Sequence, residues 1–231
     1  MTGARFGFWA SVVMGVGLLL SGPLGLALVH FIGPQPEWSG VDRFVHAYHP
    51  IQIVPYVFGL ALVWGAAGVV VAFADRTIHR GARALARFAV AAFVTLVSLN
   101  YILQTTFVPS LVRSYEPSSA VMIEHLTMSN PRSLGWALEM WGYGFLGAAT
   151  WLVVPSAPES ALERSCARLL VANGVLSIVG AVVTMLRLEW VFSTAGLAGF
   201  ALWNVLMFAL AFASALFWRE RSFAITPRFA V

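Results

Sequence analysis

Polar side chains inside long apolar runs are where this sequence is most able to do chemistry. Glu139 lies in such a run, with Trp136 three residues before it and Tyr143 four residues after it. In the preceding run, Asn100 and Gln104 are four residues apart. Residues at these spacings share one face of a helix. Ionisable groups at membrane depth are costly and usually face a bundle interior or a cavity, so the pattern predicts a polar site.

The depths of these side chains indicate that they meet. Consecutive membrane helices run antiparallel, and at about 1.5 Å per residue Gln104 and Glu139 both lie roughly 10 Å below the outer surface. Asn204, in the last apolar run, reaches a depth similar to that of Asn100. We therefore predict an outward-half pocket that binds a polar head, a cation or a proton. Its predicted residues are Asn100, Gln104, Glu139, Tyr143 and Asn204.

Two other interpretations of these residues stay open. Asn, Gln and Tyr side chains hydrogen-bond between membrane helices simply to hold a bundle together, for about 1 kcal/mol each, and a protonated Glu can do the same. A single buried carboxylate can also serve as a general acid or base in an intramembrane enzyme. Other catalytic signatures are missing from the sequence. It has no GxSxG motif, and its only two aspartates, Asp42 and Asp75, fall in loops on opposite predicted sides.

The histidines offer a weaker metal-binding alternative. His46 and His49 are three residues apart at the entrance to the second apolar run, and His125 is predicted on the same outer side. Imidazoles with nearby carboxylates can bind zinc or another divalent ion. No HExxH or CxxC pattern accompanies them, so the prediction is that these histidines are interfacial and that the protein holds no metal or other cofactor.

Composition excludes several classes of protein. Hydrophobic residues make up 59% of the 231 residues and charged residues only 10%, whereas a soluble domain has roughly a quarter charged. All 14 basic side chains are arginines, and without lysine the chain forms no Schiff base and is no retinal protein. The single Cys166 cannot form an internal disulfide. Nucleotide-binding fingerprints are absent and no segment is suited to nucleic acid, so the expected environment is the lipid bilayer.

Six stretches are long enough to cross a bilayer core of about 30 Å, which needs about 20 residues. They predict an all-α membrane bundle in a single domain, with spans at approximately 6–31, 51–74, 84–112, 133–154, 166–186 and 192–218. The Ser21-Gly22-Pro23 segment should kink the first span, because proline lacks a backbone donor. The loops 32–50 and 113–132 are the longest on the outer side and are expected to cover the mouth of the pocket.

Arginine placement predicts the orientation, because cytoplasmic loops keep an excess of positive charge. With the N-terminus inside, ten arginines are cytoplasmic and four are outside. The ten are Arg5, Arg76, Arg80, Arg83, Arg87, Arg164, Arg168, Arg219, Arg221 and Arg228, and the four are Arg43, Arg113, Arg132 and Arg187. This division predicts six spans with both termini in the cytoplasm.

The segment 100–143 carries a sequence pattern: aromatic-x-x-Gln, then Pro-Ser-Leu, then Asn-Pro, then Glu-x-x-Gly-Tyr. The matching residues are Tyr101, Gln104, Pro109, Ser110, Leu111, Asn130, Pro131, Glu139, Gly142 and Tyr143. The pattern resembles that of an uncharacterised family of bacterial six-span inner-membrane proteins, over about a fifth of the chain. The family often has an acid where this chain has Asn100. The resemblance implies a bacterial cytoplasmic membrane and the same six-span build, and it brings no activity.

Together these observations predict a membrane protein that binds or moves a small amphiphile, lipid or ion at the Glu139 pocket. The alternatives are a structural or assembly partner without a ligand and an intramembrane enzyme that uses Glu139. A transporter needs a polar path on both sides of the midplane, and Asn173 alone stands out in the inner half of a span. Substrate, protein partners and oligomeric state do not follow from the sequence.

Overall fold

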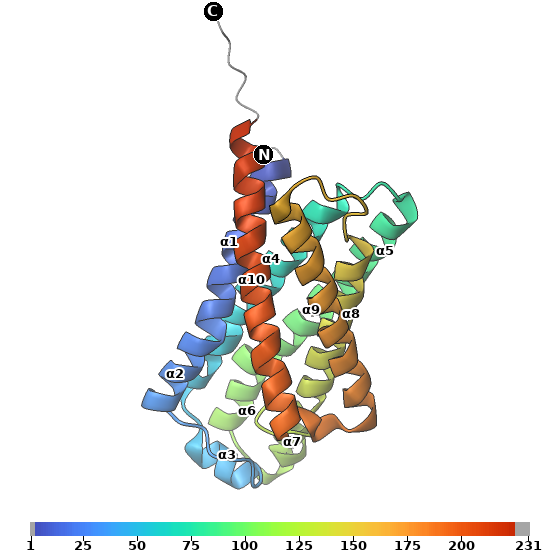
Figure 1. The fold of residues 1–231 in the computed structure, drawn as a ribbon. Coiled ribbons are helices and arrows are strands. Elements are labelled where there is room, and N and C mark those ends of the chain that lie inside the picture. Colours follow the sequence, from blue (N-terminus) through green and yellow to red (C-terminus); the bar gives the residue numbers. More distant parts are fainter. Residues whose placement is uncertain (1–2, 225–231) are drawn as a thin grey trace, which may run out of the picture.

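A computed structural model describes residues 3–224, and every regular element in that range is helical (Figure 1). The long helices are α1 (Gly3–Ser21), α2 (Pro23–Ile32), α4 (Val54–Ala74), α5 (Arg80–Ile102), α8 (Leu134–Leu152), α9 (Ala161–Leu186) and α10 (Thr194–Ala224). Shorter elements are α3 (Val41–Ala47), α6 (Val108–Arg113), α7 (Ala120–Leu126), η1 (Pro50–Ile53), the π-helical η2 (Leu103–Phe107), η3 (Pro117–Ser119) and η4 (Leu188–Phe192). Each predicted span thus corresponds to a helix, and the all-α prediction is confirmed.

Five helical stretches are long and apolar enough to cross a membrane. They are Gly3–Ile32, Pro50–Ala74, Arg80–Arg113, Ala161–Leu186 and Thr194–Ser222. Helix α8, the predicted fourth span, has 19 residues, includes the carboxylate Glu139 and is not among these five. The structure therefore shows a membrane-type helical protein with five such helices.

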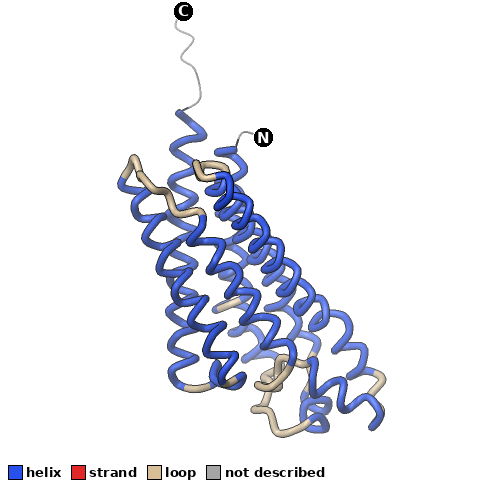
Figure 2. The backbone as a smooth tube through the Cα atoms, turned by 90° about the vertical axis from the view of Figure 1, so that its right-hand side faces the viewer, coloured by secondary structure: helices blue, strands red, loops and turns tan. Residues whose placement is uncertain are grey.

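The helices form a ring in which each one packs against the next along the chain, and α10 closes the ring against α1 (Figures 1 and 2). The most extensive interface joins α1 to α4. Glycines allow the close approach there: a Cβ built on Gly17 would lie 2.8 Å from Leu62 Cα, and one on Gly65 would lie 2.5 Å from Met14 Cα. Close backbone packing through small residues is the usual way in which membrane helices associate.

The first predicted span is broken at Gly22, where α1 ends and α2 begins with Pro23. The Gly22 N–H still donates to Leu18 O, but Pro23 has no N–H with which to continue the ladder. The predicted kink is thereby confirmed.

A second irregularity lies in the third long helix, where the π-helical turn η2 separates α5 from α6. Pro109 follows this turn and lacks a backbone donor. The hydroxyls of Thr105 and Thr106 donate to the carbonyls of Tyr101 and Ile102, at 2.9 and 2.6 Å. A π-turn in an α-helix is often found at a functional site, and this one contains Gln104.

The two ends of the bundle differ in charge. The start of α1 and the end of α10 lie at the same end, whereas α3, α6 and α7 lie at the opposite end (Figure 1). Of the arginines predicted to be cytoplasmic, nine lie near the end that holds the termini. Arg228 lies outside the described residues. The four remaining arginines lie at the opposite end.

At the end that holds the termini, a buried carboxylate joins three helices. Glu163 is 1% exposed and pairs with Arg76 at 2.8 Å and with Arg221 at 3.7 Å. The guanidinium groups of Arg76 and Arg221 also lie 5.5 and 4.7 Å from the centre of the Phe217 ring. This cluster links the end of α4, the start of α9 and the end of α10.

Glu163→Gln is expected to lower the stability of the bundle, because Arg76 and Arg221 lose their buried carboxylate and keep only the exposed Glu159 as a partner. Breaking a buried ion pair costs about 3–5 kcal/mol, and the partial exposure of Arg76 reduces the expected loss to about 2 kcal/mol. Glu220→Gln, at an exposed position of α10, is the matched control. Thermal unfolding in detergent measures the difference, and equal midpoints for the two variants would contradict the structural role of Glu163.

The opposite end carries a small apolar cluster of its own. Phe44 of α3, Val108 of α6 and Ile123 of α7 are buried together there, with Trp38 and Leu126 packed around them. The loops 32–50 and 113–132 therefore fold onto this end of the bundle.

Candidate functional site

Glu139 lies inside the ring, on the second turn of α8, and is 9% exposed. Asn100 Nδ2 donates to Glu139 Oε2 at 2.9 Å, and the Tyr101 hydroxyl donates to Oε1 at 2.7 Å. Both donors come from α5, which packs along α8. Each carboxylate oxygen thus accepts one hydrogen bond and keeps lone-pair capacity.

Gln104 supports this arrangement through Asn100 and makes no direct bond to the carboxylate. Its Nε2 donates to Asn100 Oδ1 at 3.3 Å and to Leu126 O at 2.8 Å. Its Oε1 accepts from the Met128 N–H at 3.1 Å. The end of α7 and the loop after it therefore cover Gln104 and hold it in place. No residue of the loops 32–50 or 113–132 is among the described residues that line the Glu139 pocket, so the prediction that these loops cover its mouth stays a prediction.

Tyr101 is the member of the group that the helical spacing argument did not select. It follows Asn100 in the sequence, so it projects from a different position around α5, and its hydroxyl reaches Glu139 from there. Tyr143, which was predicted, contacts the carboxylate indirectly, because its hydroxyl lies 3.4 Å from the Tyr101 hydroxyl. The match of Tyr101 to the family pattern was the one sequence signal that pointed to it.

Four of the five predicted site residues are thus brought together, and Asn204 is not. Its side-chain Nδ2 donates to the Phe200 carbonyl of its own helix at 2.8 Å. Its Oδ1 would lie 3.4 Å from a Cβ on Gly22, at the break between α1 and α2. Depth along a helix does not determine the direction of a side chain around it, so the prediction for Asn204 was wrong.

No cation balances Glu139 within residues 3–224. The ion pairs found there use other carboxylates, namely Asp75, Glu159, Glu163 and Glu189. A buried charge is strongly unfavourable unless it is paired or neutralised. Glu139 therefore needs a proton or a positively charged ligand.

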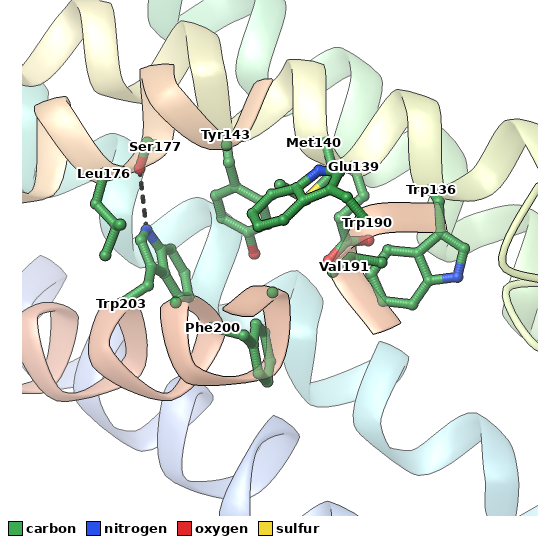
Figure 3. A pocket seen from close by; sticks show the side chains of 13 residues that line it. Trp136, Glu139, Met140, Tyr143, Leu176, Ser177, Trp190, Val191, Phe200 and Trp203 are labelled. Atoms are coloured by element: carbon green, nitrogen blue, oxygen red, sulfur yellow. Dashed lines mark hydrogen bonds between the residues drawn. The ribbon is translucent and has the colours of Figure 1, made fainter. Parts of the chain in front are cut away.

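Glu139 lines an open pocket between α8, α9, η4 and α10, with an empty volume of about 540 Å³ including its mouth (Figure 3). Aromatic side chains form most of the wall: Trp136, Tyr143, Trp190, Phe200 and Trp203. Side chains of α8 and α10 point toward one another across the space. The centres of the Tyr143 and Trp203 rings lie 4.6 Å apart. Gly199 leaves part of this space unfilled, since a Cβ built on it would meet no atom within 4 Å.

Gln104 lines a second, smaller hollow, with an empty volume of about 260 Å³ including its mouth. Its other polar walls include Tyr48 and Gln52 beneath the outer loops. The hydrogen-bonded chain from Gln104 through Asn100 to Glu139 thus connects the two hollows.

The candidate histidines lie outside this group. His46 Nδ1 lies 2.7 Å from Asp42 O in its own helix, and His49 Nδ1 accepts from the Ile51 N–H at 3.2 Å. Among the described residues, no three His, Cys, Asp or Glu side chains, His125 included, are grouped to hold a metal ion.

No protein-family model, curated protein or solved structure matches the chain. The resemblance drawn from the 100–143 pattern therefore stays a prediction. What the site can do has to be argued from its own geometry: an acceptor group held rigidly at the wall of an aromatic pocket.

Proposed function

We propose that the protein crosses a bacterial cytoplasmic membrane six times, with both termini in the cytoplasm. Helix α8 supports the sixth crossing, because its 19 residues extend for about 28 Å at 1.5 Å per residue and it occupies a full place in the ring. The arginines support the orientation, since nine lie at the end with the termini and four at the other.

We propose further that the protein binds a small amphiphile in the outward-half pocket around Glu139. The observation that carries this proposal is a buried carboxylate without an ion pair at the wall of an open apolar pocket. Ligand sites are typically apolar hollows with a few fixed polar groups, and ionisable residues within a membrane usually mark such sites. A carboxylate that served only to join helices would have no need of the adjoining space.

The mouth of the pocket faces the lipid side of the bundle. Phe200, a lining residue, is 44% exposed and belongs to a row of exposed apolar residues on α10. Members of this row are Leu197, Val205, Phe208 and Phe212. An amphiphile that is dissolved in the bilayer would reach the pocket directly, with its polar end directed toward Glu139.

Native mass spectrometry of the protein in a mild neutral detergent is expected to show a discrete adduct that Glu139→Gln loses. The substitution keeps the size of the side chain but removes its charge. It also places an amide N–H group opposite the Asn100 amide and the Tyr101 hydroxyl, which are donors themselves. Glu124→Gln, at an exposed position of α7, is the control and should keep the adduct.

If neither wild type nor Glu139→Gln carries an adduct and both unfold at the same temperature, the polar group serves only to hold the helices together. The search should then move to protein partners. A ligand that is chemically altered by the wild type and unaltered by Glu139→Gln would instead indicate an enzyme.

A further inference from the structure

The geometry points to an organic cation as the ligand: an alkylammonium head with a slender apolar body. This inference rests on the proposed binding function and names the ligand class that the pocket would select. It follows from which hydrogen-bonding groups of the pocket wall are already occupied and which remain free.

Every side-chain donor that lines the pocket is used within the protein. Three are indoles: Trp136 Nε1 donates to Met128 O at 2.7 Å, Trp190 Nε1 to Thr184 Oγ1 at 2.7 Å, and Trp203 Nε1 to Ser177 Oγ at 3.0 Å. Figure 3 shows the last of these bonds at the α9 wall. Ser177 Oγ in turn donates to Asn173 Oδ1 at 3.3 Å.

The fifth donor, the Tyr143 hydroxyl, is also engaged. Tyr101 uses its only hydroxyl proton on Glu139, so across the 3.4 Å contact between the two phenols Tyr143 is the donor. With Glu139 ionised, the side chains that line the pocket therefore offer a ligand only acceptors. The strongest acceptor is the carboxylate, which keeps a free lone pair on each oxygen.

An anion would find no donor in this wall and would be repelled by Glu139. A neutral amphiphile could fill the apolar space, but Glu139 would then have to be protonated, because an unbalanced buried charge is strongly unfavourable. A cation neutralises the carboxylate directly and needs no donor from the wall. No arginine within residues 3–224 lines the pocket, so this part of the protein supplies no competing positive charge there.

The aromatic lining favours the same ligand. Cations are attracted to the faces of Trp, Tyr and Phe rings, and clusters of such rings recognise quaternary ammonium groups. Trp190, Tyr143 and Trp203 surround the space near the carboxylate in Figure 3. The indole N–H groups of Trp190 and Trp203 are used in the hydrogen bonds described above, which leaves ring surface for the ligand.

Isothermal titration calorimetry of the protein in dodecyl maltoside micelles, whose headgroup is neutral, tests the inference with three ligands of equal chain length. These are decyltrimethylammonium, decanol and decanoate. The same titrations of the Gly199→Phe variant, in which the pocket is filled, measure the background heat of ligand that partitions into the detergent micelles. We expect wild type to prefer the cation over both others, and Glu139→Gln to weaken cation binding by roughly thirtyfold or more while binding decanol as before.

The outcomes separate the inference from the function on which it rests. Equal affinity for the three ligands, with Gly199→Phe abolishing all of them, would overturn the cation while leaving amphiphile binding intact. Binding that is the same in wild type and Gly199→Phe for every ligand would overturn both. A cation preference that survives Glu139→Gln would show that the carboxylate is not its source.

The alkylammonium group has two natural sources, the headgroup of a membrane lipid and a free amphiphilic amine. Adding phosphatidylethanolamine, with phosphatidylglycerol as the control, distinguishes them. Displacement of decyltrimethylammonium by the first lipid alone identifies a lipid headgroup. Failure of both lipids to compete, with the cation preference intact, identifies a free amine.

Discussion

Gly199→Phe is expected to abolish binding of amphiphiles to the pocket while leaving the bundle folded. A Cβ built on Gly199 meets no atom within 4 Å, so a larger side chain enters the space that a ligand would occupy. The loss of apolar contact corresponds to about 3 kcal/mol, and we therefore expect affinity to fall by roughly 100-fold or more. Calorimetric titration of the purified variant measures this loss.

Gly199→Ala is the matched control for this experiment. It adds one methyl group at the same open position, and it removes the helix penalty of glycine, which is about 1 kcal/mol. Binding should persist and the unfolding temperature should hold or rise slightly. Undiminished binding by well-folded Gly199→Phe would place the ligand elsewhere on the protein.

Gly65→Ala is expected to have the largest effect on the fold, even though it adds only one methyl group. The new Cβ would lie 2.5 Å from Met14 Cα, and backbone at such a contact can move only if α1 and α4 separate. Overpacking of this kind typically costs about 1–3 kcal/mol, and we expect a loss of at least about 3 kcal/mol where two backbones meet. The midpoint of unfolding and the yield of monodisperse protein report it.

Gly81→Ala makes the same chemical change where a Cβ meets no atom within 4 Å. Its stability should stay within about 0.5 kcal/mol of wild type, as for other surface substitutions. Should the two alanine variants prove equally stable, the close α1–α4 packing described above would be wrong.

The helices were predictable because apolar runs bounded by charged loops have few other solutions in a membrane. Helix α8 shows the limit of that argument. Its helical character followed from its length, but it is not among the five helices that are long and apolar enough to cross a membrane. Its one charged residue, Glu139, lowers its mean hydropathy, and the same residue makes it a candidate site.

The site itself was predictable in part. Asn100, Gln104 and Glu139 were found because helical spacing and depth are both readable from the sequence. Tyr101 was missed because the contact depends on how α5 is rotated against α8. Rotation also explains the wrong prediction for Asn204, whose helix position is suitable but whose side chain turns back to Phe200.

The aromatic pocket could not have been predicted from the sequence. Its rings come from α8, α10 and the short η4, and no local spacing connects them. The buried Glu163 cluster was not predicted for the same reason, since Arg76 follows α4, Glu163 lies in α9 and Arg221 lies in α10. The π-turn at Gln104 depends on how the helix adjusts to the backbone N–H that Pro109 lacks. The amino-acid composition does not show which adjustment the helix makes.

The circular order of the helices has a consequence for biosynthesis. Because α1 packs most extensively against α4, the first helical hairpin can assemble as soon as both helices have entered the bilayer. The ring closes only when α10, which follows the other helices of the ring in the sequence, inserts between α1 and α9. The pocket needs that helix for one of its walls. A nascent chain therefore acquires its scaffold first, and its capacity to hold a ligand only once α10 has been made.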